Sequence, residues 1–178
     1  MTEVADRPTG AAERASGNNG FALEVDNLST QFFTRAGVVK AVNGVSFHVR
    51  GGEILGLVGE SGSGKSVTGF SIMGLIDPPG RIVEGRILHG GKDLVTLDDE
   101  GLRQIRGNRI AMIFQDPMMT LNPVLRVDTQ MVEAVLAHQK VDRAEALEMS
   151  RLALEQVGIP APERRLKAYP HELSGGMR

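Results

Sequence analysis

The segment Gly59-Glu60-Ser61-Gly62-Ser63-Gly64-Lys65-Ser66 has the spacing G-x-x-x-x-G-K-S, which is the P-loop or Walker A pattern. Glycines let the backbone turn tightly enough for successive N–H groups to point at phosphate oxygens, and the N-terminus of a following helix adds partial positive charge. Lys65 can then reach the terminal phosphates of a nucleotide, and the Ser66 hydroxyl can ligate the accompanying Mg²⁺. The segment therefore predicts a binding site for a nucleoside triphosphate.

The residues on either side of this loop match the strand–loop–helix order that the motif requires. Residues 53–58 form a short apolar run that predicts a buried parallel strand, and residues 67–75 carry apolar side chains at helical spacing. A Gly- and Ser-rich linker is the alternative interpretation of the loop. The flanking patterns favour the P-loop over the linker.

Composition limits the class of protein. The chain has 178 residues, enough for one domain with a small insertion, and its 20 basic and 22 acidic residues give a net charge of −2, which does not indicate a nucleic-acid-binding face. It has no cysteine, which excludes disulfides, zinc–thiolate sites and thiol catalysis. No apolar run reaches the ~18 residues of a membrane-spanning helix, and the N-terminus lacks the apolar centre of a secretory signal. We therefore expect a cytosolic protein that reaches a membrane surface through a partner.

The N-terminal part of the chain predicts a disordered tail followed by strands. Residues 1–20 contain few apolar side chains. Alternation over residues 23–33 and 38–49 predicts a β-hairpin, and residues 85–91 predict another short strand. Residues 110–114 are a continuous apolar run, which predicts a second buried parallel strand.

Beyond residue 116 the composition shifts to Ala, Leu, Glu, Met and Gln, which predicts helices over residues 130–139 and 143–157. Asp142 as N-cap, with Glu145 three residues later, resembles a capping box for the second helix. Leu147, Leu154 and Val157 lie on one side of that helix and are expected to belong to the core.

The chain ends with a second possible anion-binding loop, Ser174-Gly175-Gly176, placed where a helix could begin. Alone, such a sequence is a plain turn more often than a site. A chain with a complete P-loop does not need a second phosphate loop in the same site. The economical hypothesis is a dimer in which each subunit offers this loop to the nucleotide held by the other.

Three segments in this order resemble the nucleotide-binding domain of ABC transporters: GESGSGKS at 59–66, FQDPMMTLNP at 114–123 and YPHELSGGMR at 169–178. They look most like the ATPase subunits of dipeptide and oligopeptide importers, a group that includes nickel importers. The resemblance runs from about Leu23 to the C-terminus. It implies an α/β P-loop NTPase fold with three parts: a tail at 1–20, an antiparallel β subdomain and P-loop core at 21–116, and a helical subdomain at 117–178.

The resemblance also implies roles for individual residues. Gln115 matches the Q-loop glutamine, which reaches Mg²⁺ and the attacking water and couples to the membrane-spanning subunits, so Gln115 and Lys65 are the expected catalytic residues. Phe32 falls where the family places an aromatic ring that stacks on adenine, with Phe33 as the alternative. The loop expected to contact the γ-phosphate across the dimer is Ser174, Gly175 and Gly176. The residues expected to hold ATP and Mg²⁺ are Gly59, Glu60, Ser61, Gly62, Ser63, Gly64, Lys65, Ser66 and Val67.

The implied partners are transmembrane permease subunits, a second ATP-binding subunit, either identical or similar, and indirectly an extracytoplasmic solute-binding protein. The implied location is the cytoplasmic face of the cell membrane. Dipeptides or oligopeptides are the expected solutes, and nickel and other small solutes are the less favoured alternatives.

The sequence departs from the family after the signature loop. The family places a Walker B strand, with a magnesium-binding Asp and a catalytic Glu, and a switch His beyond that point. We therefore expect a fragment of a longer ATPase, with the C-terminal part of the core missing, that binds ATP weakly and hydrolyses it negligibly alone. The alternatives are a short non-hydrolysing nucleotide-binding or regulatory form, a soluble non-transport ABC ATPase, and an unrelated P-loop kinase or GTPase.

Overall fold

A computed structural model describes residues 20–114 and 120–177. The chain divides into two compact units, Met1–Leu97 and Asp98–Arg178. The predicted tail at 1–20 lies, except for Gly20, outside the described residues. The predicted boundary after residue 116 falls within 115–119, which also lies outside them, so this boundary stays a prediction.

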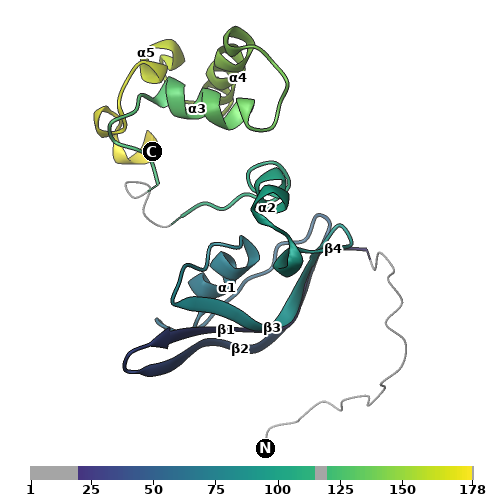
Figure 1. The fold of residues 1–178 in the computed structure, drawn as a ribbon. Helices are drawn as coiled ribbons and strands as arrows, with labels where there is room; N and C mark the ends of the chain where they lie inside the picture. Colours follow the sequence, from purple (N-terminus) through teal and green to yellow (C-terminus); the bar gives the residue numbers. More distant parts are fainter. Residues whose placement is uncertain (1–19, 115–119, 178) are drawn as a thin grey trace, which may run out of the picture. The chain divides into compact units, whose positions relative to one another are not determined.

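The first unit is built on an antiparallel sheet with the strand order β2-β1-β3-β4 (Figure 1). This arrangement confirms the predicted N-terminal antiparallel β subdomain, although the third strand begins at Gly80 rather than at residue 85. Val25 and Leu28 on β1 and Ile87 on β3 are buried in this unit. The strands are β1 (Phe21–Thr34), β2 (Gly37–Arg50), β3 (Gly80–His89) and β4 (Lys92–Asp93).

The β1–β2 pairing contains an irregularity close to the P-loop. Thr30 pairs with Val42, but the next residue, Gln31, pairs with Lys40, so Ala41 is an extra residue in β2. An extra residue of this kind bends the strand and leaves part of its backbone outside the ladder. Ala41 is also the residue whose carbonyl oxygen lies beside the P-loop.

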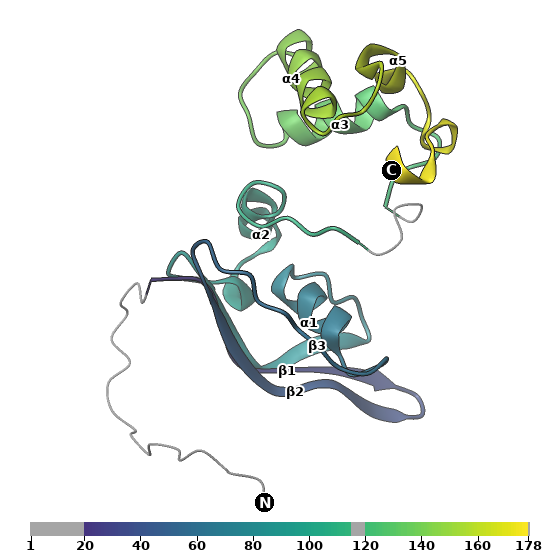
Figure 2. The ribbon, with the colours of Figure 1, turned by 180° about the vertical axis from the view of Figure 1, so that it is seen from behind.

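Helix α1 (Lys65–Ile72) packs against one face of this sheet, as both ribbon views show (Figures 1 and 2). The buried hydroxyl oxygens of Thr30 on β1 and Ser71 on α1 lie 2.8 Å apart. The sheet therefore holds the helix in part through a polar contact. The helix begins directly at Lys65, so the loop and the helix N-terminus are continuous.

The two predicted buried parallel strands are wrong. Residues 53–58 form no strand, and Ile54 and Val58 are 98% and 89% exposed. Residues 110–114 make only an isolated bridge between Arg106 and Ile110, and Ile113 is 98% exposed. A strand needs a neighbour to accept and donate its ladder hydrogen bonds. Among the residues that the structure describes, neither run pairs with a neighbouring strand. Most of their apolar side chains are exposed, while Ile110 and Met112 are half-buried.

The second unit is helical, with α3 packed against α4 and α5 (Figure 1). Its core contains the buried Val127, Leu166 and Leu173, with Met131, Leu154 and Met177 packed against them. None of the helices in the described ranges is long and apolar enough to span a bilayer. The elements are α2 (Asp99–Ile105), α3 (Val127–Leu136), α4 (Arg143–Gln156), α5 (Pro162–Leu166) and the short 3₁₀ turns η3 (Pro170–Glu172) and η4 (Gly175–Met177); a further turn, η1 (Leu94–Thr96), belongs to the first unit.

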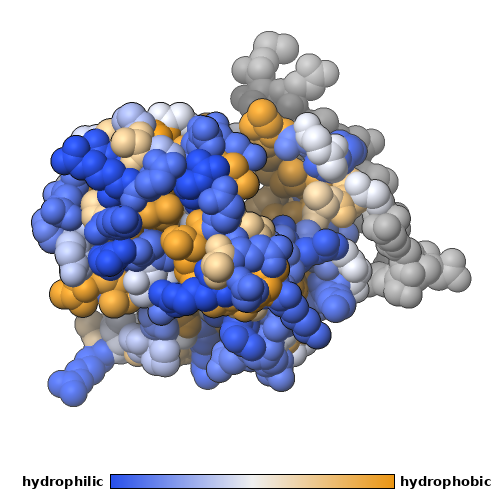
Figure 3. Space-filling model, turned by 90° about the horizontal axis from the view of Figure 1, so that it is seen from above, coloured by the Kyte–Doolittle hydropathy of each residue, from blue (hydrophilic) through white to orange (hydrophobic). Residues whose placement is uncertain are grey.

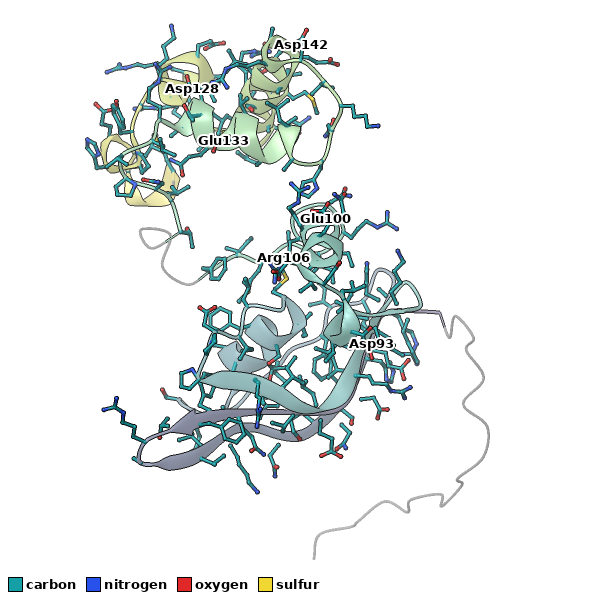
Figure 4. All side chains as sticks on the ribbon, viewed as in Figure 1. Asp93, Glu100, Arg106, Asp128, Glu133 and Asp142 are labelled. Atoms are coloured by element: carbon teal, nitrogen blue, oxygen red, sulfur yellow. The ribbon has the colours of Figure 1, made fainter. Side chains whose placement is uncertain are left out.

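The predicted start of α4 is confirmed, but its predicted core face is only partly correct. The Asp142 carboxylate accepts a hydrogen bond of 2.8 Å from the Glu145 N–H at the beginning of the helix (Figure 4). Leu154 packs into the core, whereas Leu147 and Val157 are 41% and 72% exposed. The stripe buried on this helix runs instead through Ala146 and Ser150, with Leu154 continuing it.

Hydrophobic side chains also reach the surface elsewhere. Figure 3 shows a face on which hydrophilic side chains predominate and hydrophobic ones gather in smaller patches. Scattered exposed apolar residues of this kind are normal for a folded domain. The exposure of residues 54–58 is different, because four large apolar side chains lie close together there, namely Ile54, Leu55, Leu57 and Val58.

Candidate functional site

The P-loop leads from the exposed run 53–58 into α1, and glycines set its path. Gly62 and Gly64 have φ angles of 82° and 90°, in the left-handed region that side chains disfavour. A Cβ atom on Gly64 would lie 2.2 Å from the carbonyl oxygen of Ala41. Only glycine therefore fits where the loop passes against β2.

The N-terminus of α1 is open to an anion. Gly64 is the N-cap residue, and neither a side-chain cap nor an acidic residue occupies the first turn. The helix begins with the Thr68 N–H donating to the Gly64 carbonyl at 2.8 Å. The preceding N–H groups of Lys65, Ser66 and Val67 have no acceptor within the helix and are available to phosphate oxygens.

The Lys65 side chain folds back over its own loop. Its ammonium group donates to the carbonyl oxygens of Gly59 and Glu60, at 2.8 and 2.7 Å, and to the Ser63 hydroxyl at 3.3 Å. These three acceptors match the three donors of an ammonium group. All three acceptors are neutral, so a phosphate oxygen would replace them with a stronger, charge-assisted partner.

The other loop residues differ in their exposure. Glu60, Ser61 and Ser66 are exposed, and Val67 is half-buried. Glycine at position 59 leaves room for the Ser63 side chain, since a Cβ atom on residue 59 would lie 2.6 Å from the Ser63 hydroxyl oxygen.

The Ser66 hydroxyl is a suitable oxygen ligand for Mg²⁺. This ion prefers oxygen donors and is commonly held by one or two protein groups together with substrate phosphates and water. Among the described residues, no group of three or more His, Asp or Glu side chains could hold a metal ion. Gln115, the other predicted ligand and catalytic residue, lies outside the described residues, so its role stays a prediction.

The two candidate adenine-stacking residues lie on opposite faces of β1. Thr30 and Phe32 are two residues apart and therefore share the face that carries α1, while Phe33 points to the other side. The Phe32 ring packs over Gly80, where a Cβ atom would lie 2.6 Å from its Cε1. The guanidinium carbon of Arg81 lies 4.2 Å from the centroid of the exposed Phe33 ring. The geometry places Phe32 on the side of the P-loop helix, and its contact with adenine stays a prediction.

The predicted signature loop belongs to the second unit. Ser174, Gly175 and Gly176 are exposed, and the Met177 N–H donates to the Ser174 carbonyl at 3.0 Å as η4 begins. Leu173 before the loop and Met177 after it both pack in the core of the helical unit. The loop is therefore anchored at both ends and presents its hydroxyl and backbone to solvent.

Sequence reasoning missed the residues that position the P-loop. Ala41 lies beside Gly64, and Thr30 holds α1 through Ser71. None of these residues belongs to a motif. The alternation in β1 could indicate a buried face, but the pairing of Thr30 with a helix residue 41 positions away could not be read from local pattern.

Comparisons with known proteins identify the family of this chain. The family model described as "ABC transporter" matches residues 42–178. The probable peptide ABC transporter ATP-binding protein y4tR of Sinorhizobium fredii (strain NBRC 101917 / NGR234) is 52% identical over 157 residues, which are 88% of this chain and 47% of that protein. The oligopeptide transport ATP-binding protein OppD of Bacillus subtilis (strain 168) is 50% identical over 157 residues, 88% of this chain and 44% of that protein. The chain thus spans about half the length of these relatives.

A solved structure has the same fold. The dimeric structure of MJ0796, a bacterial ABC transporter cassette, superposes with a TM-score of 0.72. The superposition covers 87% of this chain and 64% of that one, at 24% sequence identity. At this identity the likeness establishes the architecture alone.

Proposed function

This chain belongs to the ABC transporter family, and from that premise we propose that it is the ATP-binding part of a subunit that energises the uptake of dipeptides or oligopeptides. The observation that carries the proposal is the P-loop at the uncapped N-terminus of α1, with Lys65 held above it by neutral acceptors. The names of the two peptide-transport relatives support peptides as the solute class. Nickel and other small solutes remain alternatives without a specific observation in their favour.

ATP binding would use the groups already described. The N–H groups at the start of α1 would hold the phosphates, and the ammonium group of Lys65 would leave the carbonyls of Gly59 and Glu60 for phosphate oxygens. Ser66 would ligate Mg²⁺, which neutralises charge on the phosphates when it is bound. Phe32 would stack on the adenine ring.

Assembly would complete the site. The exposed loop of Ser174, Gly175 and Gly176 would contact the nucleotide held by a second ATP-binding subunit, and Gln115 would act at the Mg²⁺ and the attacking water. Permease subunits would hold the pair at the cytoplasmic face of the membrane, with a solute-binding protein on the other side. Nucleotide-driven closing and opening of such a pair would move the permease between its states.

Hydrolysis belongs, in this proposal, to the whole protein in its assembly. Phosphoryl transfer needs positioning, charge neutralisation and a group that orients the attacking water. The P-loop contributes the first two. We expect the 178-residue chain alone to bind ATP weakly and to hydrolyse it negligibly.

The test measures the binding of a fluorescent ATP analogue to the 178-residue chain. Lys65→Met should weaken saturable binding by about tenfold or more, because a charge-assisted contact to phosphate is lost. Lys92→Met, at an exposed lysine of β4, is the matched control and should bind like the wild type. Equal binding by wild type and Lys65→Met would refute the assignment of the P-loop as the nucleotide site.

A second measurement tests the transport role. The full-length protein should co-purify with permease subunits and hydrolyse ATP faster in their presence, whereas a soluble ABC ATPase would show neither behaviour. A full-length protein that binds ATP and never turns it over would favour the regulatory alternative.

A further inference from the structure

A second concentration of positive charge lies in the helical unit, outside the P-loop and the signature loop. Arg164, Arg165, Lys167, Ala168 and Glu172 line a cavity of about 420 Å³. Three of these five residues are cationic and one is acidic. Solvated charges on an exposed helix face are common, but here they surround a concave site.

The three cationic side chains that line this cavity are not engaged in ion pairs among the described residues. Within the described part of the chain, no hydrogen bond or ion pair is formed by the side chains of the three cationic residues, and the Nε of Arg165 is buried without a partner. A buried donor left unpaired is costly and uncommon in folded proteins. Because this nitrogen is inaccessible to solvent, the groups that an occupant of the cavity can reach are the exposed parts of the three cationic side chains that line it.

The neighbouring carboxylates are engaged elsewhere. Glu172, which lines the cavity, accepts a hydrogen bond of 2.8 Å from the Tyr169 N–H, in the cap of η3. Glu163, the first acidic residue of α5, lies 3.6 Å from the guanidinium of Arg151 on α4. The Glu172 carboxylate keeps its negative charge, so Arg164, Arg165 and Lys167 leave a formal excess of two positive charges around the cavity, from three cations and one carboxylate.

We propose that this cavity binds a phosphate-class oxyanion, held by Arg164, Arg165 and Lys167. Guanidinium groups bind phosphate through paired N–H donors, and a compact ammonium group adds a point charge. Three cations suit a doubly charged phosphate better than a single carboxylate. The oxyanion can be a free phosphate compound or the headgroup of an anionic phospholipid, since both present the same chemistry.

An occupant would bridge two segments of the helical unit. Arg164 and Arg165 belong to α5, whereas Glu172 ends η3, directly before the buried Leu173 and the exposed loop at 174–176. The inference does not depend on the proposed transport function, because it uses none of the P-loop residues.

The experiment uses the ¹⁵N-labelled 178-residue chain and inorganic pyrophosphate, with backbone amide signals followed by NMR. Saturable shifts are expected at Lys167 and Ala168, separate from those at Gly64 that report binding to the P-loop. The double variant Arg164→Gln/Lys167→Gln changes two exposed side chains and should weaken the response at Ala168 by about tenfold or more. Lys65→Met should weaken only the response at Gly64.

Arg143→Gln, at an exposed arginine of the same unit, is the control and should leave the Ala168 response unchanged. The proposal is overturned if Ala168 shows no saturable shift, or if the double variant binds like the wild type while its helical circular dichroism is unaltered. A response at Ala168 to hexaglutamate but not to pyrophosphate also overturns it, and assigns the cavity to an acidic protein segment.

Vesicle flotation distinguishes the two possible sources of the phosphate group, a lipid headgroup and a free phosphate compound. Retention on phosphatidylglycerol vesicles but not on phosphatidylcholine vesicles, lost in Arg164→Gln/Lys167→Gln, supports a lipid headgroup. Pyrophosphate binding without retention on either vesicle supports a free phosphate compound.

Discussion

The hydroxyl oxygens of Thr30 and Ser71 lie 2.8 Å apart in a buried contact that joins β1 to α1. Ser71 also donates its single hydroxyl proton to the Val67 carbonyl, at 2.8 Å, so Thr30 is the donor in the pair. The contact positions the helix whose N-terminus carries the P-loop. The geometry of the phosphate site therefore depends on a residue far from it in sequence.

Replacing Thr30 with Val tests this contact. The side chains have nearly the same shape, so the substitution removes the hydrogen bond and leaves the Ser71 hydroxyl without its donor. We expect the free energy of unfolding, measured by urea denaturation, to fall by about 1 kcal/mol. Thr34→Val is the control, because its hydroxyl bond to Gly37 is exposed and water can replace it. An equal loss in both variants would show that burial of the Thr30–Ser71 pair has no special effect.

Gly64→Ala should distort the P-loop. The new Cβ would lie 2.2 Å from the Ala41 carbonyl oxygen, in a backbone conformation with φ at 90°, so both strain and a backbone clash result. Gly62→Ala is the matched control, since its φ is 82° but no atom lies within 4 Å of the added Cβ. We expect Gly62→Ala to lower the free energy of unfolding by about 1 kcal/mol, from the φ alone.

Gly64→Ala should lower the unfolding free energy further and also weaken nucleotide binding. The measurements are urea denaturation and titration with a fluorescent ATP analogue. Indistinguishable stability of the two variants would mean that the loop can move away from β2 without cost.

The choice between Phe32 and Phe33 is tested by comparing two ligands. Phe32→Leu should weaken ATP binding by about twofold to tenfold, the range for losing an aromatic stacking contact, and leave the binding of pyrophosphate at the P-loop unchanged. Phe33→Leu should change the binding of neither ATP nor pyrophosphate, because the Phe33 ring lies on the opposite face of β1. Isothermal titration with both ligands measures the effect. A selective loss of ATP affinity in Phe33→Leu would reverse the assignment.

Acid should weaken an ionic contact on α4. Glu148 accepts hydrogen bonds from Arg151, and this contact lowers the pKa of the Glu148 carboxyl. A carboxyl with a lowered pKa in the folded state stabilises the protein above its unfolded pKa, about 4.3, and loses that contribution as pH falls through the folded pKa. The wild type should therefore lose more thermal stability between pH 6 and pH 3 than Glu148→Gln does.

The readout is the difference in Tm between the two pH values. Because Glu148 is exposed, the effect should be small and should shrink further in high salt. Glu133→Gln, at an exposed position of α3 (Figure 4), should keep the wild-type pH dependence. If Tm of Glu148→Gln depends on pH as strongly as Tm of the wild type, the contact between Glu148 and Arg151 is excluded as the cause of that dependence.

Several features followed from sequence because their causes are local. The P-loop spacing defined the glycine-rich turn and the helix that begins at Lys65, since each residue there acts on neighbours within a few positions. Asp142 capped α4 for the same reason. The strand alternation around the turn at residues 35–36 likewise predicted the hairpin of β1 and β2.

Other features depended on partners that a local pattern does not contain. The apolar runs at 53–58 and 110–114 indicated buried strands, but a strand also needs a neighbour for its backbone hydrogen bonds, and most side chains of both runs are exposed. The resemblance left Phe32 and Phe33 as alternative stacking residues, whereas only the tertiary structure decided which face of β1 carries α1.

The chemical character of the candidate phosphate site was thus predicted from the sequence alone, because the P-loop consists of eight consecutive residues. The position of that site against β2 and β1, through Ala41 and Thr30, was decided by the tertiary structure. The reason is physical: hydrogen bonds and steric contacts between distant residues exist only after the sheet and the helix have packed together.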